Sequence, residues 1–402
     1  MRDGPVITGC GAVTSVASSA GGTWSAVRAG ASGVRTLLPG TEPPAGSRVA
    51  PSSGVDTEAF GVAPRDARIM GLPALLLLSS AREAMDDAGL DPKLCGPDAI
   101  AFYAGMGMVD PAPEDLRAAV LASRGPDGID YRRFFGDGYR EIHPLWPLAM
   151  LNNVGFCLAA GHAGVSGDNA VFSPGADSAL LALSEACDAV ASGRAAAALA
   201  AGASERVSAA SVARACAVGG WGGPESRCVP SEGAAAVVVE SAQAARARGA
   251  AALATVAGWG FSSSRAPAAG FAAAMERALE HTSDVALPVD AVLLHDERCQ
   301  GRDEAERKAV AGVLGAGSTP PVLLSSKGIV GHCLAGGPAV DVLLAARMLA
   351  EGVVPPALTA TERSPGRTDD SAPALAMRPR RIVVNSCSWG GSYGSVVLDV
   401  TE

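Results

Sequence analysis

The sequence has few aromatic residues, no long hydrophobic run and no cluster of basic residues. Aromatics make up 4% of the 402 residues, whereas 48% are hydrophobic, so alanine, valine and leucine must fill the core. The longest apolar runs, such as Ala195–Ala201, are too short to span a bilayer, so we expect no membrane segment. A formal net charge of −9 without a Lys/Arg run is not typical of a nucleic-acid-binding protein.

The cysteines show no spacing that would predict a metal site or a disulfide framework. There are nine, an odd number, with no CxxC pair and no Cys/His ligand spacing. We therefore expect reduced thiols, no metal and no organic cofactor. The N-terminus enters an apolar strand within five residues, without the basic and apolar regions of a secretory signal, so we expect a cytoplasmic protein.

Short apolar runs alternate with helix-like segments along the chain. We predict strands at Pro5–Gly9, Ala99–Ala104, Asn169–Ser173, Ala195–Ala201, Ala234–Glu240, Ala251–Gly258, Asp290–His295, Pro321–Ser325, Arg381–Asn385 and Ser395–Val400. We predict helices at Gly22–Ala29, Leu75–Ala88, Ala179–Ala191, Pro267–His281, Asp303–Leu314 and Ala335–Glu351. Strands separated by helices indicate an α/β protein whose parallel strands are covered by helices on both faces.

The order of elements suggests that one βαβαβαββ unit is duplicated. The two halves would comprise residues 1–245 and 246–402. Residues 106–147 fit neither half, because they are rich in proline, glycine, aspartate and aromatics. We interpret this segment as an insertion that caps a site or forms a dimer surface.

One strand runs into a tight turn of the kind that presents a nucleophile at a helix N-terminus. It is Asn169-Ala170-Val171-Phe172-Ser173-Pro174-Gly175-Ala176-Asp177-Ser178. The sharpest position holds Ala176, which cannot attack a substrate, and Ser173 and Ser178 flank it without a recognisable Ser-His-Asp arrangement. An ordinary strand–helix turn with Asp177 near the cap is the alternative interpretation.

Two of the five histidines follow predicted strands, where parallel α/β proteins place their ligand sites. His295 ends one strand, with Asp303 and Glu306 nearby, and His332 follows Lys327 by five residues across a glycine turn. Such a histidine can serve in acid–base chemistry or donate a hydrogen bond to an oxyanion. A buried histidine with a purely structural role is the alternative in each case.

A glycine turn follows the strand near the C-terminus, at Asn385-Ser386-Cys387-Ser388-Trp389-Gly390-Gly391-Ser392. Glycines there allow positive φ or a close approach to a ligand. The segment does not match a phosphate-binding loop, because it lacks the Walker lysine and the GxGxxG pattern.

Together these segments resemble the β-ketoacyl synthases of the thiolase superfamily, and the resemblance extends over nearly the whole chain. Ser325–His332 is similar to the SxKxxxGH motif, Asn385–Ser392 to NSFGFGG, and Ser231–Ala235 to the GEGA strand entry. Val6–Thr14 resembles the first strand and its glycine turn. The resemblance implies a thiolase fold, in which two βαβαβαββ halves form five α-β-α-β-α layers.

The resemblance also assigns roles to individual residues. His295 and His332 match the two histidines that decarboxylate the extender and stabilise its enolate, with Lys327 organising the site and Glu306 as its acidic partner. Trp389, followed by Gly390 and Gly391, matches the aromatic gate of the acyl pocket. Ala176 aligns with the nucleophilic cysteine of the family's xCxSG turn, so one catalytic position matches in place but not in chemistry.

A second departure from the family lies in the HGTGTxxxD motif, which here reads His295-Asp296-Glu297-Arg298-Cys299-Gln300-Gly301-Arg302-Asp303. Both threonines that would contact a pantetheine arm are gone. Without the cysteine, condensation cannot follow the covalent route of the family.

These departures favour a chain-length-factor-type subunit of a bacterial type II polyketide synthase. Such a subunit pairs with a competent ketosynthase as a heterodimer, meets the acyl carrier protein through that complex, and shapes the acyl pocket without condensing. The alternative is a cysteine-less decarboxylase that makes starter units from a malonyl carrier protein with His295 and His332. A third alternative is acyl transfer by Ser173 or Ser178.

Overall fold

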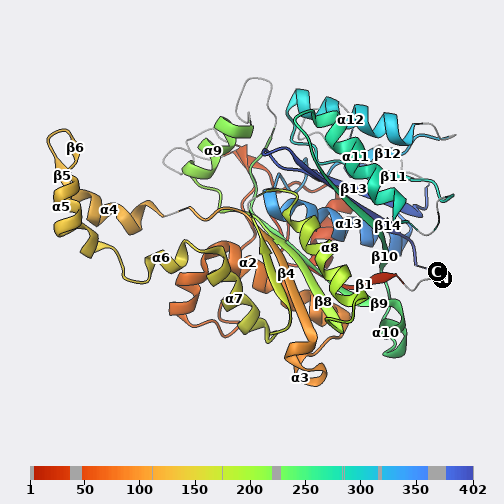
Figure 1. The fold of residues 1–402 in the computed structure, drawn as a ribbon, viewed down its shortest axis with the longest axis horizontal. Helices are drawn as coiled ribbons and strands as arrows, with labels where there is room; N and C mark the ends of the chain where they lie inside the picture. The colour runs from red at the N-terminus through yellow and green to blue at the C-terminus, as the bar shows by residue number, and fades with distance from the viewer. Residues whose placement is uncertain are drawn as a thin grey trace.

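The structure is a computed structural model that describes residues 4–36, 48–110, 112–173, 175–219, 228–282, 284, 286–315, 319–360 and 377–401. All ten predicted strands are present, with ends shifted by a few residues. They are β1 (Pro5–Val13), β4 (Ile100–Met106), β7 (Asn169–Phe172), β8 (Ala197–Ala203), β9 (Ala234–Ser241), β10 (Ala254–Ser263), β11 (Ala291–Leu293), β12 (Val322–Leu324), β13 (Arg381–Cys387) and β14 (Ser392–Asp399). They form one sheet in the order β12-β11-β13-β14-β10-β1-β9-β8-β4-β7 (Figure 1).

The strand order repeats between the two halves of the chain. In each half the first strand is antiparallel to the last, as β1 is to β9 and β10 to β14. Beside β9 lies β8, and beside β14 lies β13, each antiparallel to its neighbour. Two further strands, parallel to that one, complete each half: β4 and β7 after β8, and β11 and β12 after β13. The halves join where β1 pairs with β10 through Val6–Thr255 and Ile7–Ala254. This repeat is the duplicated topology that the order of elements predicts.

Helices form three layers around these strands. On one side, α2 (Pro64–Ala88) packs on β1, β8 and β9, with α7 (Asn152–Ala163) beside it. On the other, α11 (Pro267–Glu280) packs on β10, β13 and β14, with α12 (Gln300–Leu314) beside it. Between them, α8 (Ser178–Ala191) and α13 (Gly337–Glu351) contact strands of both halves (Figure 1). The five-layered α-β-α-β-α arrangement is therefore confirmed.

Glycine pairs explain how closely the outer helices pack. A Cβ atom at Gly9 or Gly11 of β1 would collide with backbone atoms of α2, and one at Gly258 or Gly260 of β10 would collide with backbone atoms of α11. The same two positions of the first strand are thus reserved for glycine in both halves, because each outer helix lies directly on the strand backbone.

The helix α2 differs from its prediction. It begins at Pro64, in the first helical position, rather than at Leu75, and Gly71 interrupts it with φ 63°. Gly71 and Pro73 interrupt the helical pattern, so only the regular part of the helix can be recognised in the sequence. The other predicted helices are confirmed to within three residues at their ends, including α1 (Ala20–Ala29).

The predicted insertion is an arm that projects from the body of the protein, at the left of Figure 1. It contains α4 (Pro113–Ala122), β5 (Arg124–Gly125), β6 (Gly128–Ile129), α5 (Tyr131–Gly136), η2 (Gly138–Glu141) and α6 (Trp146–Ala149).

The remaining elements are β2 (Arg35–Thr36), β3 (Arg48–Val49), α3 (Pro92–Cys95), η1 (Pro97–Ala99), α9 (Ala209–Gly219), α10 (Ala242–Ala247), η3 (Leu334–Gly336) and η4 (Pro356–Leu358). The predicted boundary at 245/246 falls within α10 and stays a prediction. Among the described helices, none has the length and apolarity needed to cross a membrane.

Candidate functional site

The structure brings His295 and His332 together at the carboxyl ends of the parallel strands β11 and β12. Their ring centroids are 5.0 Å apart, and the ring planes are nearly perpendicular at 86°. Both side chains are buried. Two histidines that are 37 positions apart in sequence therefore face one another, as the carboxyl-end rule for parallel strands predicts.

The tautomer of His332 is set by a backbone group. The Leu334 N–H donates to His332 Nδ1 at 3.2 Å, so the neutral ring carries its proton on Nε2. Burial, together with the charges of His295 and Lys327, holds the pKa of His332 well below its usual range. His332 is therefore a neutral hydrogen-bond donor rather than a cation.

The pKa of His295 is shifted in the opposite direction. Burial alone would lower its pKa, but the Cys387 sulfur and the Glu297 carboxylate raise the pKa well above its ordinary value. Nε2 of His295 lies 3.2 Å from Glu297 Oε1, and Nδ1 lies 3.5 Å from Ser386 Oγ. One histidine of the pair thus favours a positive charge and the other opposes one.

The acidic partner of Lys327 is Asp341, so the assignment of Glu306 to that role is corrected. Lys327 Nζ forms an ion pair with Asp341 Oδ2 inside the protein, and Ser326 Oγ donates to the second oxygen at 2.6 Å. Glu306 instead accepts from the backbone N–H of His295 at 2.9 Å. Glu306 therefore fixes the start of the loop after β11 and not the lysine.

Ala176 lies in the turn between β7 and α8, where it is buried. The next residue, Asp177, accepts hydrogen bonds from Ser388 Oγ at 2.9 Å and from Ser392 Oγ. The turn is thereby tied to the glycine loop that follows β13. An alanine methyl group has no nucleophilic atom, so this turn offers no covalent chemistry at its sharpest position.

The structure does not place the other candidate nucleophiles in a triad-like setting. Ser173 Oγ accepts from the side chain of Asn152 at 3.0 Å, and Ser178 is buried in the first turn of α8. Cys157 is exposed on α7, and Cys187 lies inside α8, where burial raises the pKa of its thiol. No contact described for Ser173 links it to a histidine that would activate it.

The loop after β11 combines unusual backbone conformations with charged side chains. Asp296 and Arg298 have φ angles of 47° and 58°, a region that normally favours glycine. These are the two glycine positions of the HGTGT motif, so the loop keeps that shape with other residues. Glu297, at the first threonine position, pairs with Arg302 at 2.7 Å, and Arg298 lies 3.6 Å from Asp296. A carboxylate thus stands at the position of the first threonine of the motif, and the Cys299 thiol at that of the second.

The residues of the predicted gate lie on the loop between β13 and β14. Trp389 is half-buried, Gly390 is exposed, and Gly391 has φ 84°, which requires glycine. The N–H of Gly391 donates to Ser388 O at 3.0 Å, and Ser264 N–H donates to Gly391 O at 2.9 Å. The loop is tightly hydrogen-bonded, and the gating role of Trp389 stays a prediction.

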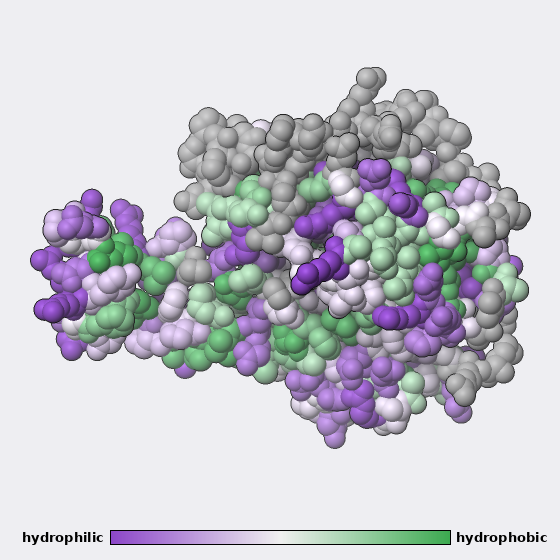
Figure 2. Space-filling view, turned by 45° about the horizontal axis from the view of Figure 1, so that its top comes forward, coloured by the Kyte–Doolittle hydropathy of each residue, from purple (hydrophilic) through white to green (hydrophobic). Residues whose placement is uncertain are grey.

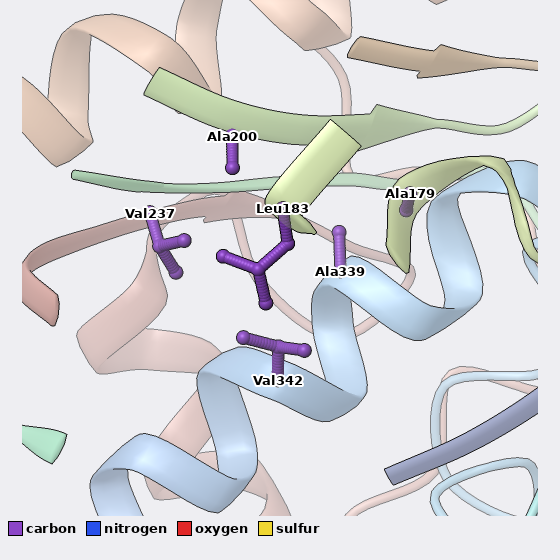
Figure 3. A pocket seen from close by; sticks show the side chains of 6 residues that line it. All are labelled: Ala179, Leu183, Ala200, Val237, Ala339 and Val342. Atoms are coloured by element: carbon purple, nitrogen blue, oxygen red, sulfur yellow. The ribbon is translucent and has the colours of Figure 1, made fainter. Parts of the chain in front are cut away.

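Two cavities have very different sizes and linings. The first measures about 10 Å³, room for about one water molecule, and Figure 3 shows it enclosed between α8, α13 and the strands β8 and β9. Its lining is apolar: Ala179, Leu183, Ala200, Val237, Ala339 and Val342. The second, of about 610 Å³, lies where Arg65 and Arg68 of α2 face Trp146 and His143 near the arm. The first of these cavities is far too small for an acyl chain.

Comparison with known families identifies the class of protein. The model of the β-ketoacyl synthase N-terminal domain matches residues 5–245, and that of the C-terminal domain matches residues 247–361. The chain belongs to the β-ketoacyl synthase family, which confirms the resemblance drawn from the motifs.

Similar proteins include bacterial 3-oxoacyl-[acyl-carrier-protein] synthases and a putative polyketide β-ketoacyl synthase. A 3-oxoacyl-[acyl-carrier-protein] synthase 2 of Vibrio harveyi is 30% identical over 133 residues, 32% of each chain. A putative polyketide β-ketoacyl synthase 1 of Streptomyces cyaneus is 33% identical over 129 residues, 32% of this chain and 30% of that protein. The matched region is therefore about a third of the length of these curated relatives.

Several solved structures share the fold over the full length of both chains. The ishigamide ketosynthase/chain length factor has a TM-score of 0.81 at 21% identity. A β-ketoacyl synthase from Burkholderia phymatum has 0.82 at 23%. A type II polyketide ketosynthase, solved with its acyl carrier protein, has 0.78 at 19%. At these identities the similarity establishes the fold.

Proposed function

We propose that this chain is a non-condensing, chain-length-factor-type subunit that pairs with a ketosynthase and shapes a shared acyl pocket in type II polyketide biosynthesis. The observation that carries the proposal is Ala176 at the nucleophile position of the turn between β7 and α8. The fold supplies the strand, the turn and the helix, but the Ala176 side chain has no atom that can accept an acyl group. A ketosynthase partner would have to supply the nucleophile.

The charged loop after β11 supports the same proposal. Glu297 and Arg302 form an ion pair where the family binds a pantetheine arm, and Glu297 also contacts His295. A pantetheine group that entered here would have to displace the buried Glu297 carboxylate from its contacts with His295 and Arg302, which is strongly unfavourable. We infer that the carrier protein delivers its chain to the partner's site and meets this subunit only through the complex.

Two surfaces of the chain support association with a partner. The edge strand β7 pairs with β4 on one side, and an unpaired edge of this kind is a common place for strand addition. The arm carries exposed hydrophobic side chains, and Figure 2 shows green patches on it among hydrophilic residues. These side chains are Val120, Leu121, Ile129, Tyr131, Phe135, Tyr139 and Leu148. We expect an obligate interface of roughly 2,000 Å² or more and a monomer that is unstable alone.

A reconstitution assay tests the proposal. The chain and the ketosynthase encoded beside it are supplied with malonyl carrier protein, separately and together, while condensation product and carbon dioxide are measured. We expect condensation from the pair and no carbon dioxide release from this chain alone. Carbon dioxide release by the chain alone would contradict the proposal.

Decarboxylation of a malonyl carrier protein is the second candidate, and the state of the histidines favours it. His332 presents a neutral Nε2–H, and His295 favours a positive charge; together these can stabilise an enolate oxygen. The step itself would break the bond to the carboxylate, release carbon dioxide and leave an enolate that takes a proton. If it occurs, His332→Ala abolishes carbon dioxide release, whereas His143→Ala, in a histidine outside this site, leaves it unchanged.

A further inference from the structure

Three side chains that commonly bind metals meet beside His332. A ring nitrogen of His295, a carboxylate oxygen of Glu297 and the sulfur of Cys387 lie within 4.8 Å of one another, and all three residues are buried. They come from two neighbouring parallel strands, since His295 and Glu297 follow β11 and Cys387 ends β13. The register of the sheet therefore creates the cluster from residues about 90 positions apart.

We propose that His295, Glu297 and Cys387 bind a divalent transition metal, with zinc as the best fit. Imidazole nitrogen, carboxylate oxygen and thiolate sulfur are the donors that zinc takes in proteins. Bond lengths of about 2.0–2.3 Å and tetrahedral angles put donor atoms about 3.3–3.5 Å apart. The His295 Nε2–Glu297 Oε1 distance of 3.2 Å is close to this value. On binding, the Cys387 thiol and Nε2 of His295, whose pKa is raised, would each lose a proton to solvent, and thiolate and carboxylate would balance the two metal charges.

The surroundings of the cluster suit such a site. Arg302 Nη1 donates to both oxygens of Glu297, at 2.7 Å to Oε2 and 2.9 Å to Oε1; on metal binding it would keep the contact with Oε2 while Oε1 turned to the metal. Ser386 Oγ lies 3.5 Å from Nδ1 of His295, the ring nitrogen that stays free for a hydrogen bond. Partners of this kind orient metal ligands in known sites.

Three protein ligands leave one position of a tetrahedral zinc ion open, and a water molecule would complete four-coordination.

The proposed donors coincide with departures from the family motifs. Glu297 and Cys299 replace the two threonines of HGTGT, and Cys387 stands at the first phenylalanine of NSFGFGG. Glu297 and Cys387 thus place two metal-binding side chains beside the retained His295. The expectation of no metal came from spacing along the sequence, which cannot detect ligands from separate strands.

Metal analysis of the purified full chain, followed by titration of the metal-free protein with Co²⁺, tests the proposal. We expect about one zinc per chain and, with Co²⁺, an ultraviolet thiolate-to-cobalt charge-transfer band with the visible bands of a tetrahedral site. Cys387→Ser should remove most of the charge-transfer band and weaken binding by at least about tenfold. Glu297→Gln, which keeps the side-chain shape, should weaken binding while leaving that band.

Cys187→Ala is the matched control, because Cys187 is also a buried cysteine but lies inside α8. It should leave metal content and spectrum unchanged. A charge-transfer band that survives Cys387→Ser would show binding by other thiols, such as the exposed Cys95, Cys157 or Cys216, and would overturn the proposal. Wild-type protein with no retained zinc and no tetrahedral Co²⁺ spectrum would overturn it as well.

Discussion

Lys327 and Asp341 form an ion pair that is almost completely buried, with 4% and 1% of their side chains exposed. The pair joins the SxKxxxGH loop to α13, the helix at the centre of the five layers. Removing one partner leaves an uncompensated charge inside the protein. We expect Asp341→Asn to lower the free energy of unfolding by about 3–5 kcal/mol, measured by urea denaturation.

Glu351→Gln provides the control for this prediction. Glu351 lies on the same helix and pairs with Arg28 at 3.3 Å, but the side chains of Arg28 and Glu351 are 53% and 35% exposed. Its replacement should change the free energy of unfolding by less than about 1 kcal/mol. Equal effects of the two substitutions would show that the Lys327–Asp341 pair does not stabilise the site.

Restoring a cysteine in the nucleophile turn should not restore condensation. In the Ala176→Cys protein the thiol would have no productive substrate, because Glu297, held by Arg302, stands at the first of the two threonine positions of the HGTGT motif. We expect no acyl-enzyme by intact-protein mass spectrometry with an acyl carrier protein substrate, and no condensation product. Turnover by this single variant would contradict the scaffold role.

Hydrophobic residues on the arm should govern association with the partner. Phe135 is 71% exposed on α5, and we expect Phe135→Asp to weaken complex formation at least tenfold, measured by titration with the ketosynthase. Leu94→Asp is the control, because Leu94 is 87% exposed on α3, away from the arm. Equal binding by both variants would exclude the arm from the interface.

The phenol of Tyr103 should ionise at a higher pH than that of an ordinary tyrosine. Burial, with a hydrogen bond to Asp168, raises the pKa of its phenol from 10.0 to about 12. The folded state therefore binds this proton more tightly than the unfolded state, so the associated stability is complete below pH 10 and is lost as the pH rises to about 12. Ultraviolet titration should show a late tyrosinate transition that Tyr103→Phe removes and Tyr131→Phe, at an exposed tyrosine, preserves. Titration of Tyr103 near pH 10 would contradict this.

The sequence predicted the strands and their duplication because each strand is a short apolar run that alternates with helix-like segments. It also predicted that His295 and His332 meet, since both follow parallel strands. It did not identify Asp341, which lies inside a hydrophobic helix 14 residues after Lys327 and belongs to no motif. Residues that pair only through the packing of a helix on a loop leave no local pattern.

The same limit applies to Cys387 and to the arm. Cys387 looks like an ordinary buried residue of a strand, and only the register of β11 and β13 places it beside His295 and Glu297. The arm was recognised by composition as an insertion, but its helices are short, so periodicity did not predict them. Glu306 was assigned to Lys327 by analogy, and its actual partners are backbone N–H groups.

The most direct test of the central claim is a native mass spectrum of this chain co-expressed with the ketosynthase encoded beside it. A pairing subunit without a nucleophile should co-purify as a stable one-to-one heterodimer. A homodimer of this chain that ignores the ketosynthase would contradict the proposed role and favour the decarboxylase.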